Sequence, residues 1–341
     1  MDTAVEHCRR GEMPQALAMF RAIREQLDPP PALLKLIAEL EAGACVQPAV
    51  AANAPWGVRI GGGWDSNVSQ GITARTLALG SGPNTIELEL DPSFRPRSAA
   101  FVQAAADFSV ALPRHGLNLQ LGLSQRINAG AREFDIRAVS AAASREFALP
   151  VGVLRGHLEA MEIWLGNRHY QHGQTAVVQW LLDRTRGATL ASLQATSVQY
   201  VTQPLQDASV FELGVLNEWR LDPSHTVHAG LSVQRDHARR ARPGGDRRGA
   251  TFTAGAVLIE HGWRLRPQVA YTAWNSRQVF APGLLDVRRR NRLHQLALQA
   301  ERPLGAGTSL LLEWRGRWAS DTIALYRYQS QSVSAMLAYR F

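Results

Sequence analysis

The sequence lacks any long apolar run. No stretch approaches the roughly 18 consecutive apolar residues that a membrane-spanning helix needs, and the mean hydropathy is −0.17. A chain of this kind can cross a membrane only with strands, whose water-facing side chains dilute the lipid-facing ones. Apolar residues still make up 45% of the 341 residues. This leaves enough for a large buried or lipid-facing surface.

Lysine is almost absent, because Lys35 is the only one, and arginine carries the net charge of +8. The arginines are scattered or lie in predicted loops, at 239–240, 247–248 and 288–290. No helix-turn-helix, finger or base-stacking motif accompanies them, so we expect no nucleic-acid partner. Arginines that line a lumen, or that face outer-membrane lipid and lipopolysaccharide, explain the charge better.

Cysteine and catalytic motifs are also scarce. Cys8 and Cys45 are the only cysteines, so no disulfide framework supports the rest of the chain. No Gly-x-Ser-x-Gly segment occurs. The two histidines of His169-Tyr170-Gln171-His172 have one near-ligand spacing, but no carboxylate or cysteine partner lies beside them in sequence. We therefore predict no catalytic, metal-binding or cofactor-binding residue.

A hydrolase remains the alternative from a different functional class, since some membrane barrels are lipases or proteases. Scattered serines and aspartates could in principle complete a triad around a histidine, but the pattern selects none of the candidates. These candidates are His157, His169, His172 and His294.

Residues 1–44 have a helical pattern, and no secretory signal peptide begins at Met1. Apolar residues at helical spacing precede and follow a break at 28–31, Asp-Pro-Pro-Pro. Two short helices around a turn resemble a tetratricopeptide unit, which cannot bury its apolar faces alone. We interpret the segment as the last repeat of a truncated array; a plain amphipathic hairpin is the alternative. We predict that residues 45–55 are a linker.

From residue 56 to 341 apolar and polar residues alternate in run after run, most strictly in 117–124, Leu-Asn-Leu-Gln-Leu-Gly-Leu-Ser. This period of two predicts strands with one apolar face. Short turns alternate with longer polar connections along the chain. We place the longer ones near 69–97, 128–134, 166–173, 202–208, 237–249, 276–290 and 320–328.

Seven long loops and six short turns separate about 14 strands. Bacterial barrels have short periplasmic turns and long extracellular loops, and closure removes the unpaired strand edges that lipid cannot satisfy. We predict an all-β fold, a 14-stranded antiparallel transmembrane β-barrel at 56–341 in the bacterial outer membrane. The even strand count places its C-terminus on the periplasmic side, with the helical segment.

The last strand, 332–341, carries Leu337, Tyr339 and Phe341 on one face. An aromatic residue at the end of a strand that closes the chain resembles the signal read by the barrel-insertion machinery of the outer membrane. An ordinary edge strand of a soluble β-domain is the alternative.

Three stretches together resemble one family: two motifs and the final strand, 333–341, which resembles the family's C-terminus. A tetratricopeptide segment before a barrel of this size is also that family's architecture. Gly63-Trp64-Asp65-Ser66-Asn67-Val68 is similar to the segment that opens the barrel of surface lipoprotein assembly modifiers (Slam proteins), and Ser320-Asp321 with Tyr326-Arg327-Tyr328 resembles that family's last loop. Asp321 departs from the family's Asn, and 289–291 from its Arg-x-Asp. A turn-capping role is the structural alternative for Asp65, Ser66 and Asn67.

The resemblance implies a non-catalytic translocation factor that helps a client lipoprotein reach the cell surface, without a cofactor. The nearest rival has the same fold: a porin that exports an exopolysaccharide. A general diffusion porin is a third possibility, in which the helical segment has no purpose. An acidic lumen would favour export of a partly cationic polymer. The net positive charge of this chain mildly disfavours the polymer-export alternative.

Overall fold

A computed structural model of the protein describes residues 56–80, 85–112 and 116–341. The helical segment predicted at 1–44, the linker at 45–55 and both cysteines lie outside these ranges. No helix of the described part is long and apolar enough to cross a membrane. The strands are β1 Trp56–Asp65, β2 Thr76–Leu79, β3 Ile86–Glu89, β4 Ala99–Leu112, β5 Leu117–Asn128, β6 Ile136–Ala148, β7 Val153–Leu165, β8 Arg168–Arg184, β9 Gly187–Tyr200, β10 Ala208–Arg220, β11 His225–Ala238, β12 Arg247–Glu260, β13 Trp263–Ala281, β14 Leu285–Gly305, β15 Thr308–Asp321 and β16 Tyr328–Arg340. The 3₁₀ turns within the described ranges are η3 Pro92–Phe94, η5 Arg132–Phe134, η6 Pro204–Gln206 and η7 Ala324–Tyr326.

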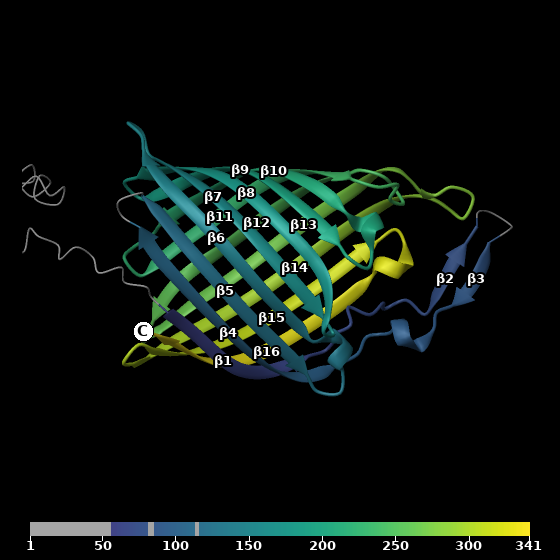
Figure 1. Cartoon of the computed structure of the whole chain (residues 1–341), viewed down its shortest axis with the longest axis horizontal. Coiled ribbons are helices and arrows are strands. Elements are labelled where there is room, and N and C mark those ends of the chain that lie inside the picture. Colours follow the sequence, from purple (N-terminus) through teal and green to yellow (C-terminus); the bar gives the residue numbers. More distant parts are fainter. Residues whose placement is uncertain (1–55, 81–84, 113–115) are drawn as a thin grey trace, which may run out of the picture. The chain divides into compact units, whose positions relative to one another are not determined.

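Fourteen of the described strands form a closed antiparallel barrel, in which each strand pairs with its neighbour in sequence and β1 pairs with β16 (Figure 1). This confirms the predicted fold and strand number. The strands β2 and β3 form a separate two-stranded hairpin in the long connection between β1 and β4. Closure satisfies the backbone groups of β1 and β16, which would otherwise be exposed edges.

The alternation of side chains places apolar residues outside the barrel and polar residues inside it. On β5, Leu119, Leu121 and Leu123 are 40%, 44% and 48% exposed on the outer face. Their neighbours Asn118 and Gln120 point to the lumen, where they line a cavity. A barrel in water would have the reverse arrangement, so this alternation matches a wall between lipid and water.

The short turns lie at one end of the barrel and the longer loops at the other, here called the loop end (Figure 1). Two of the predicted long loops are wrong. At 166–173 the connection is only Gly166 and Asn167, both with positive φ, and β8 begins at Arg168. Both central residues of a type I′ hairpin turn have positive φ, which glycine and asparagine tolerate.

The second wrong loop is the one predicted at 276–290. Here β13 and β14 continue to pair as far as Ala281 and Leu285, with bulges on the way. Polar side chains do not end a ladder where strands extend beyond the apolar band, because both faces of such a hairpin then contact water. The polar stretch was therefore strand rather than loop.

Glycines in β1 allow it to approach its neighbours closely. A Cβ on Gly61 would lie 2.1 Å from the backbone oxygen of Ala335 on β16. A Cβ on Gly63 would lie 2.1 Å from the oxygen of Val333 and 2.7 Å from the ring of Phe101. Any side chain at these positions would push β1 and β16 apart, because real Cβ atoms do not come this close to backbone.

Candidate functional site

The candidate site is the lumen, whose wall is polar along its length. A cavity of about 840 Å³ lies against β4 to β8 and another of about 450 Å³ against β11 to β15. Charged and amide side chains line both, including Gln120, Glu146, Arg155, His157 and Gln179 in the first and Arg266, Gln268, Gln299, Glu313, Arg315 and Arg317 in the second.

Charges of both signs alternate on this wall. Arg155 Nε donates to Glu146 Oε1 at 2.9 Å across β6 and β7. Arg266 Nη2 lies 3.2 Å from Glu301 Oε2 across β13 and β14. Arg317 has no salt bridge to a described residue. A wall with paired and unpaired charges stabilises water and hydrophilic solutes rather than an apolar ligand.

Three clusters lie at the loop end of the lumen, each built from an aspartate, an arginine and an aromatic ring. In the first, Arg126 Nη2 on β5 donates to Asp65 Oδ2 on β1 at 3.0 Å. Its guanidinium carbon lies 3.7 Å above the ring of Phe101, on the intervening strand β4. The other oxygen of Asp65 accepts hydrogen bonds from Ser330 Oγ at 3.0 Å and from the Asn67 N–H at 2.9 Å.

The second cluster joins β14, β15 and η7. Arg289 Nε donates to Asp321 Oδ2 at 2.8 Å, and Asn291 Nδ2 donates to the same oxygen at 3.1 Å. The guanidinium carbon of Arg289 lies 3.4 Å above the ring of Tyr326. Asp321 Oδ1 accepts the N–H of Ile323 at 3.0 Å, so this carboxylate caps its turn as Asp65 does.

The third cluster holds a deeply buried carboxylate with two arginine partners. Asp236 on β11 is 1% exposed and accepts two hydrogen bonds from Arg242, at 2.7 and 3.2 Å. Arg247 Nε donates to it at 2.8 Å, and the Arg247 guanidinium carbon lies 5.5 Å from the ring of Trp274. Arg242 also donates to the backbone oxygen of Gly245 at 3.2 Å, which fixes the loop between β11 and β12.

A carboxylate outside the strands supports the same loop. Asp246 accepts the N–H of Ala238 and a hydrogen bond from His237 Nδ1, both at 3.1 Å. Burial raises the pKa of Asp246, but these hydrogen bonds and the attraction of Arg277 outweigh burial and hold the pKa below its ordinary value. The carboxylate is therefore ionised at neutral pH.

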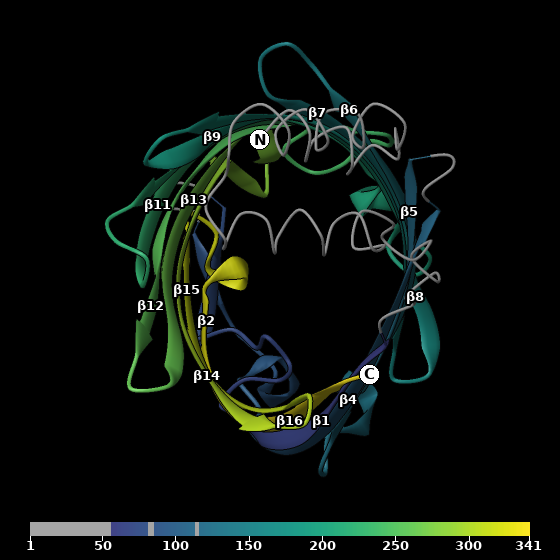
Figure 2. The same cartoon turned by 90° about the vertical axis from the view of Figure 1, so that its left-hand side faces the viewer.

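Loops at this end of the barrel bond to one another. The connection between β1 and β4 bonds to the loop after β15, where the Thr73 N–H donates to the oxygen of Arg327 at 3.0 Å. It also bonds to the β13–β14 turn, where the Gly80 N–H donates to Leu284 at 2.9 Å. In the end-on view of Figure 2, the yellow turn η7 lies inside the outline of the strands. The loop end of the lumen is thus narrower than the strands alone would leave it.

The structure places the motif residues in two regions. Asn67 is 2% exposed and donates from Nδ2 to the oxygens of Gly71 and Gln329, at 2.9 and 2.8 Å. Ser66 Oγ accepts the N–H of Gln331 at 2.8 Å. These bonds join β1 to β16 at the loop end, with the turn-capping geometry given above as the structural alternative. The remaining motif residues lie around this seam: Gly63 faces Phe101, Trp64 lies on the outer face, Tyr326 lies under Arg289, and Tyr328 begins β16.

The predicted insertion signal lies at the other end of the same seam. Leu337, Tyr339 and Phe341 are 55%, 39% and 72% exposed on the outer face. The rings of Tyr339 and Phe341 meet edge to face at 4.4 Å, and the Phe341 N–H donates to the oxygen of Trp56 at 3.0 Å. The C-terminus is therefore bound to the first residue of β1.

The histidines do not form one site. No carboxylate lies beside His169 and His172 in sequence, but the fold brings Glu162 on the neighbouring strand into contact with both, with His169 at 2.6 Å. Among the described residues no group of three or more His, Cys, Asp or Glu side chains is arranged to hold a metal ion. His157 faces the lumen, whereas His294 on the outer face packs against the ring of Tyr271 at 4.9 Å.

Sequence reasoning missed the arginine partners of the three clusters and all of the third cluster. Asp236, Arg242 and Arg247 form no motif that could be recognised in advance. The one available signal was the repeated pattern of an aspartate at the loop end of a strand, as at Asp65 and Asp321.

No family model matches the chain, and no curated protein matches it. Solved structures do. An anion-selective porin from Comamonas acidovorans is 11% identical with a TM-score of 0.43, and covers 84% of this chain and 98% of its own. A BenF-like porin from Pseudomonas fluorescens is 9% identical at 0.42, and a bacterial polysaccharide outer-membrane secretin is 11% identical at 0.43, both with the same coverage.

Proposed function

We propose that this protein is a bacterial outer-membrane β-barrel that transports a hydrophilic substrate through its polar lumen. The proposal rests on the distribution of side chains in the barrel wall, which is the reverse of that in a water-soluble barrel. Apolar side chains cover the outer face, and paired charges line the inner one. Leu121 and Leu158 are 44% and 63% exposed outside, while Glu146 and Arg155 form an ion pair inside.

The membrane location follows from the energetics of the outer face. Exposed side chains such as Phe211, Leu213 and Val215 are 49%, 57% and 46% accessible along one strand. Contiguous apolar surface of this extent is avoided in water, where each Å² costs about 25 cal/mol. Lipid removes the cost, and the closed ladder leaves no strand edge unpaired within it.

We expect the transported substrate to be water-soluble and without a large net charge, because positive and negative side chains both line the lumen. A porin is therefore supported, including one that exports a polysaccharide. Single-channel conductance of the refolded chain in a planar bilayer tests this proposal. A large, steady conductance supports a pore. A barrel that inserts and never conducts contradicts it.

A second candidate is delivery of a client lipoprotein to the cell surface, as the resemblance to Slam proteins implies. It is supported by the seam between β1 and β16, which has nine registered residue pairs, against ten to fourteen in the other ladders of the barrel. Glycines on β1 give the seam few interlocking side chains. A seam of this kind could open toward the lipid to release an acylated client.

A disulfide across the seam separates the two candidates. Ile60 and Leu337 are registered on the outer face, at a spacing that a disulfide can bridge. Ile60→Cys with Leu337→Cys, in a chain with both native cysteines changed to serine, would lock the seam. Leu213→Cys with Val233→Cys, registered across β10 and β11, is the matched control.

If a client lipoprotein passes through the seam, the first pair abolishes its surface display until reductant is added, and the control pair leaves display unchanged. Display that persists with the seam locked contradicts passage through the seam. Conductance of the locked barrel should equal that of the control, because the lumen is untouched.

A further inference from the structure

A row of arginines lies on the outer face near the loop end. Arg235 on β11 is registered with Arg248 on β12, and Asn275 on β13 separates Arg248 from Arg290 on β14. Side chains alternate along a strand, so Arg235 shares the outer face with Val233, which is 52% exposed. We call Arg235, Arg248 and Arg290 the outer arginine row.

The row has no anionic partner within the described part of the chain. Each of its three side chains is exposed, and none makes a hydrogen bond or salt bridge to another described residue. Neighbouring strands lie about 4.8 Å apart, so Arg235 and Arg248 face each other directly, which is destabilising for like charges. The acidic residue beside this region, Asp246, is already paired with His237. An external anion would remove the repulsion.

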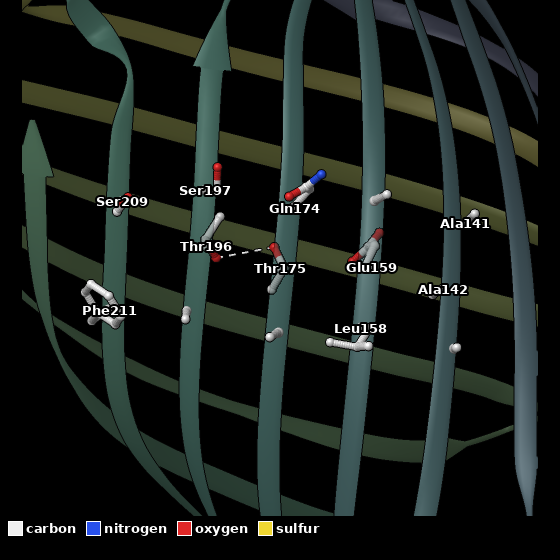
Figure 3. Close-up of a pocket in the computed structure, with 14 residues that line it drawn as sticks. Ala141, Ala142, Leu158, Glu159, Gln174, Thr175, Thr196, Ser197, Ser209 and Phe211 are labelled. Atoms are coloured by element: carbon white, nitrogen blue, oxygen red, sulfur yellow. Dashed lines mark hydrogen bonds between the residues drawn. The ribbon is translucent and has the colours of Figure 1, made fainter. Parts of the chain in front are cut away.

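Beside the row the outer wall is hollowed, with a volume of about 680 Å³. Leu158, Ala176, Ala195 and Phe211 occupy one register across β7 to β10. Figure 3 shows the bulky side chains of Leu158 and Phe211 on the two strands that flank β8 and β9. In the same register, β8 and β9 carry only the alanines Ala176 and Ala195. We call this depression the outer hollow. Its floor is apolar and has the width of two strands, enough for an acyl chain.

The outer hollow becomes polar toward the loop end. Two residues closer to the loop end, the outer face of β9 and β10 carries the registered pair Ser197 and Ser209. Arg239 bonds to both hydroxyls. Arg239 Nη2 donates to Ser197 Oγ at 2.8 Å and Nε donates to Ser209 Oγ at 3.1 Å. Nη1 of this exposed guanidinium has no hydrogen bond to a described residue. The hydroxyls thus hold an arginine at the end of an apolar depression.

The outer hollow and the outer arginine row are adjacent, because Phe211 is registered both with Ala195 in the hollow and with Arg235 in the row. We propose that together they bind one phosphorylated lipid of the leaflet at the loop end. An acyl chain lies in the hollow, and a phosphate accepts hydrogen bonds from Arg239, Arg235 and Arg248. Guanidinium groups suit phosphate because they donate two parallel hydrogen bonds.

This inference rests on the proposed membrane location. The site lies where the apolar band meets polar side chains, which is where a lipid changes from acyl chain to head group. An amphiphile with an anionic head matches both halves of the site. A soluble phosphate matches only the arginines, and an acyl chain alone matches only the hollow.

The test uses the full chain refolded in zwitterionic detergent, with binding measured by native mass spectrometry. The probes are a bisphosphorylated lipid A, the same lipid without phosphates, and inorganic phosphate. Arg235→Gln with Arg248→Gln removes two charges from the row. The matched control, Arg137→Gln with Arg317→Gln, removes one outward arginine on β6 and one lumen arginine.

We expect lipid A to bind the wild type and the control equally and the row variant at least about tenfold more weakly. Ala195→Phe, which fills the hollow, should also weaken binding, whereas Leu193→Phe on the same face should not. Equal binding by the row variant and the control, or equal binding of the dephosphorylated lipid, overturns the inference. So does inorganic phosphate that binds as tightly as lipid A. A chain that forms no barrel in lipid would instead contradict the proposed function.

Discussion

Arg126 reaches across a whole strand to Asp65: it starts on β5, lies on the ring of Phe101 on β4 and donates to the carboxylate on β1 at 3.0 Å. The side chains of the pair are 23% and 12% exposed. An ion pair so shielded is worth more than one at an open surface, and its loss leaves a charge without a partner. Because Asp65 also bonds Ser330 on β16, the pair links three consecutive ladders at the loop end.

Asp65→Asn should therefore destabilise the barrel by about 2 kcal/mol, since Arg126 loses its anion while the turn-capping oxygen is kept. The measurement is urea unfolding in detergent, followed by tryptophan fluorescence. Asp107→Asn is the control. Asp107 lies 3.6 Å from Arg59 with both side chains about half exposed, and such a pair contributes at most about 0.5 kcal/mol. If both variants lower the free energy of unfolding equally, the Asp65–Arg126 cluster contributes no more to stability than an exposed ion pair.

Asp236→Asn should cost more, about 3–5 kcal/mol, because two guanidinium groups then share one neutral acceptor in a buried place. Asp236 and Arg242 are only 1% and 3% exposed in their side chains. We expect the loop at 239–246 to become accessible to protease before the barrel unfolds. Arg240→Gln, whose guanidinium lies 3.8 Å from Asp207 at an exposed position, is the control for loop cleavage. If Asp236→Asn and the control are cut at the same rate, the cluster does not hold the loop.

The barrel itself could be predicted because its signal is local. Alternation within 117–124 fixes the outer face of one strand without knowledge of its partners, and the C-terminal strand is equally clear. Loop boundaries failed where polarity was taken as the end of a strand. Gly166-Asn167 is a type I′ turn signal that could have corrected one error. Strands β13 and β14 carried no such signal.

The clusters could not be predicted, because their members are distant in sequence. Asp65 and Arg126 are 61 residues apart, and Ser330 is 265 residues from Asp65. Their approach depends on strand register around the whole barrel, which no local pattern specifies. The motif Asp65-Ser66-Asn67 did mark the right place, since Asx residues at the end of a strand indicate a turn.

Phe341→Ala should lower the amount of assembled barrel in the membrane several-fold, with little effect on a barrel once formed. Phe341 is 72% exposed, and its ring meets that of Tyr339 edge to face, a contact worth about 1 kcal/mol. Its backbone N–H would still bond to Trp56. The amount of assembled barrel in outer-membrane fractions is measured from its heat-modifiable migration in gels. Urea unfolding measures the stability of the barrel once formed. Trp56→Ala, which changes the aromatic residue at the start of the neighbouring strand β1, is the control. A normal yield of Phe341→Ala contradicts the insertion-signal hypothesis.

Arg317→Glu should shift the ion selectivity of the channel toward cations, on the order of twofold in permeability ratio. Arg317 lines the cavity against β11 to β15 and has no salt bridge to a described residue, so its charge faces the solute. Arg315→Glu should act less, because Arg315 already pairs with Glu313 at 2.6 Å. Reversal potentials in a salt gradient measure both. An unchanged reversal potential would mean that ions do not pass this wall.

The loop at 239–246 should loosen in acid. The folded-state pKa of Asp246 is held below its ordinary value, so its contribution is complete above the unfolded pKa of about 3.9 and is lost as pH falls through the folded value. Below that pH the Ala238 N–H loses its acceptor and should exchange faster with deuterium, after correction for intrinsic rates. In Asp246→Ala, which removes the acceptor oxygen, the Ala238 N–H should exchange fast already at neutral pH and show no further acid step. Acid-induced exchange at Ala238 that persists in Asp246→Ala would assign the transition to another group.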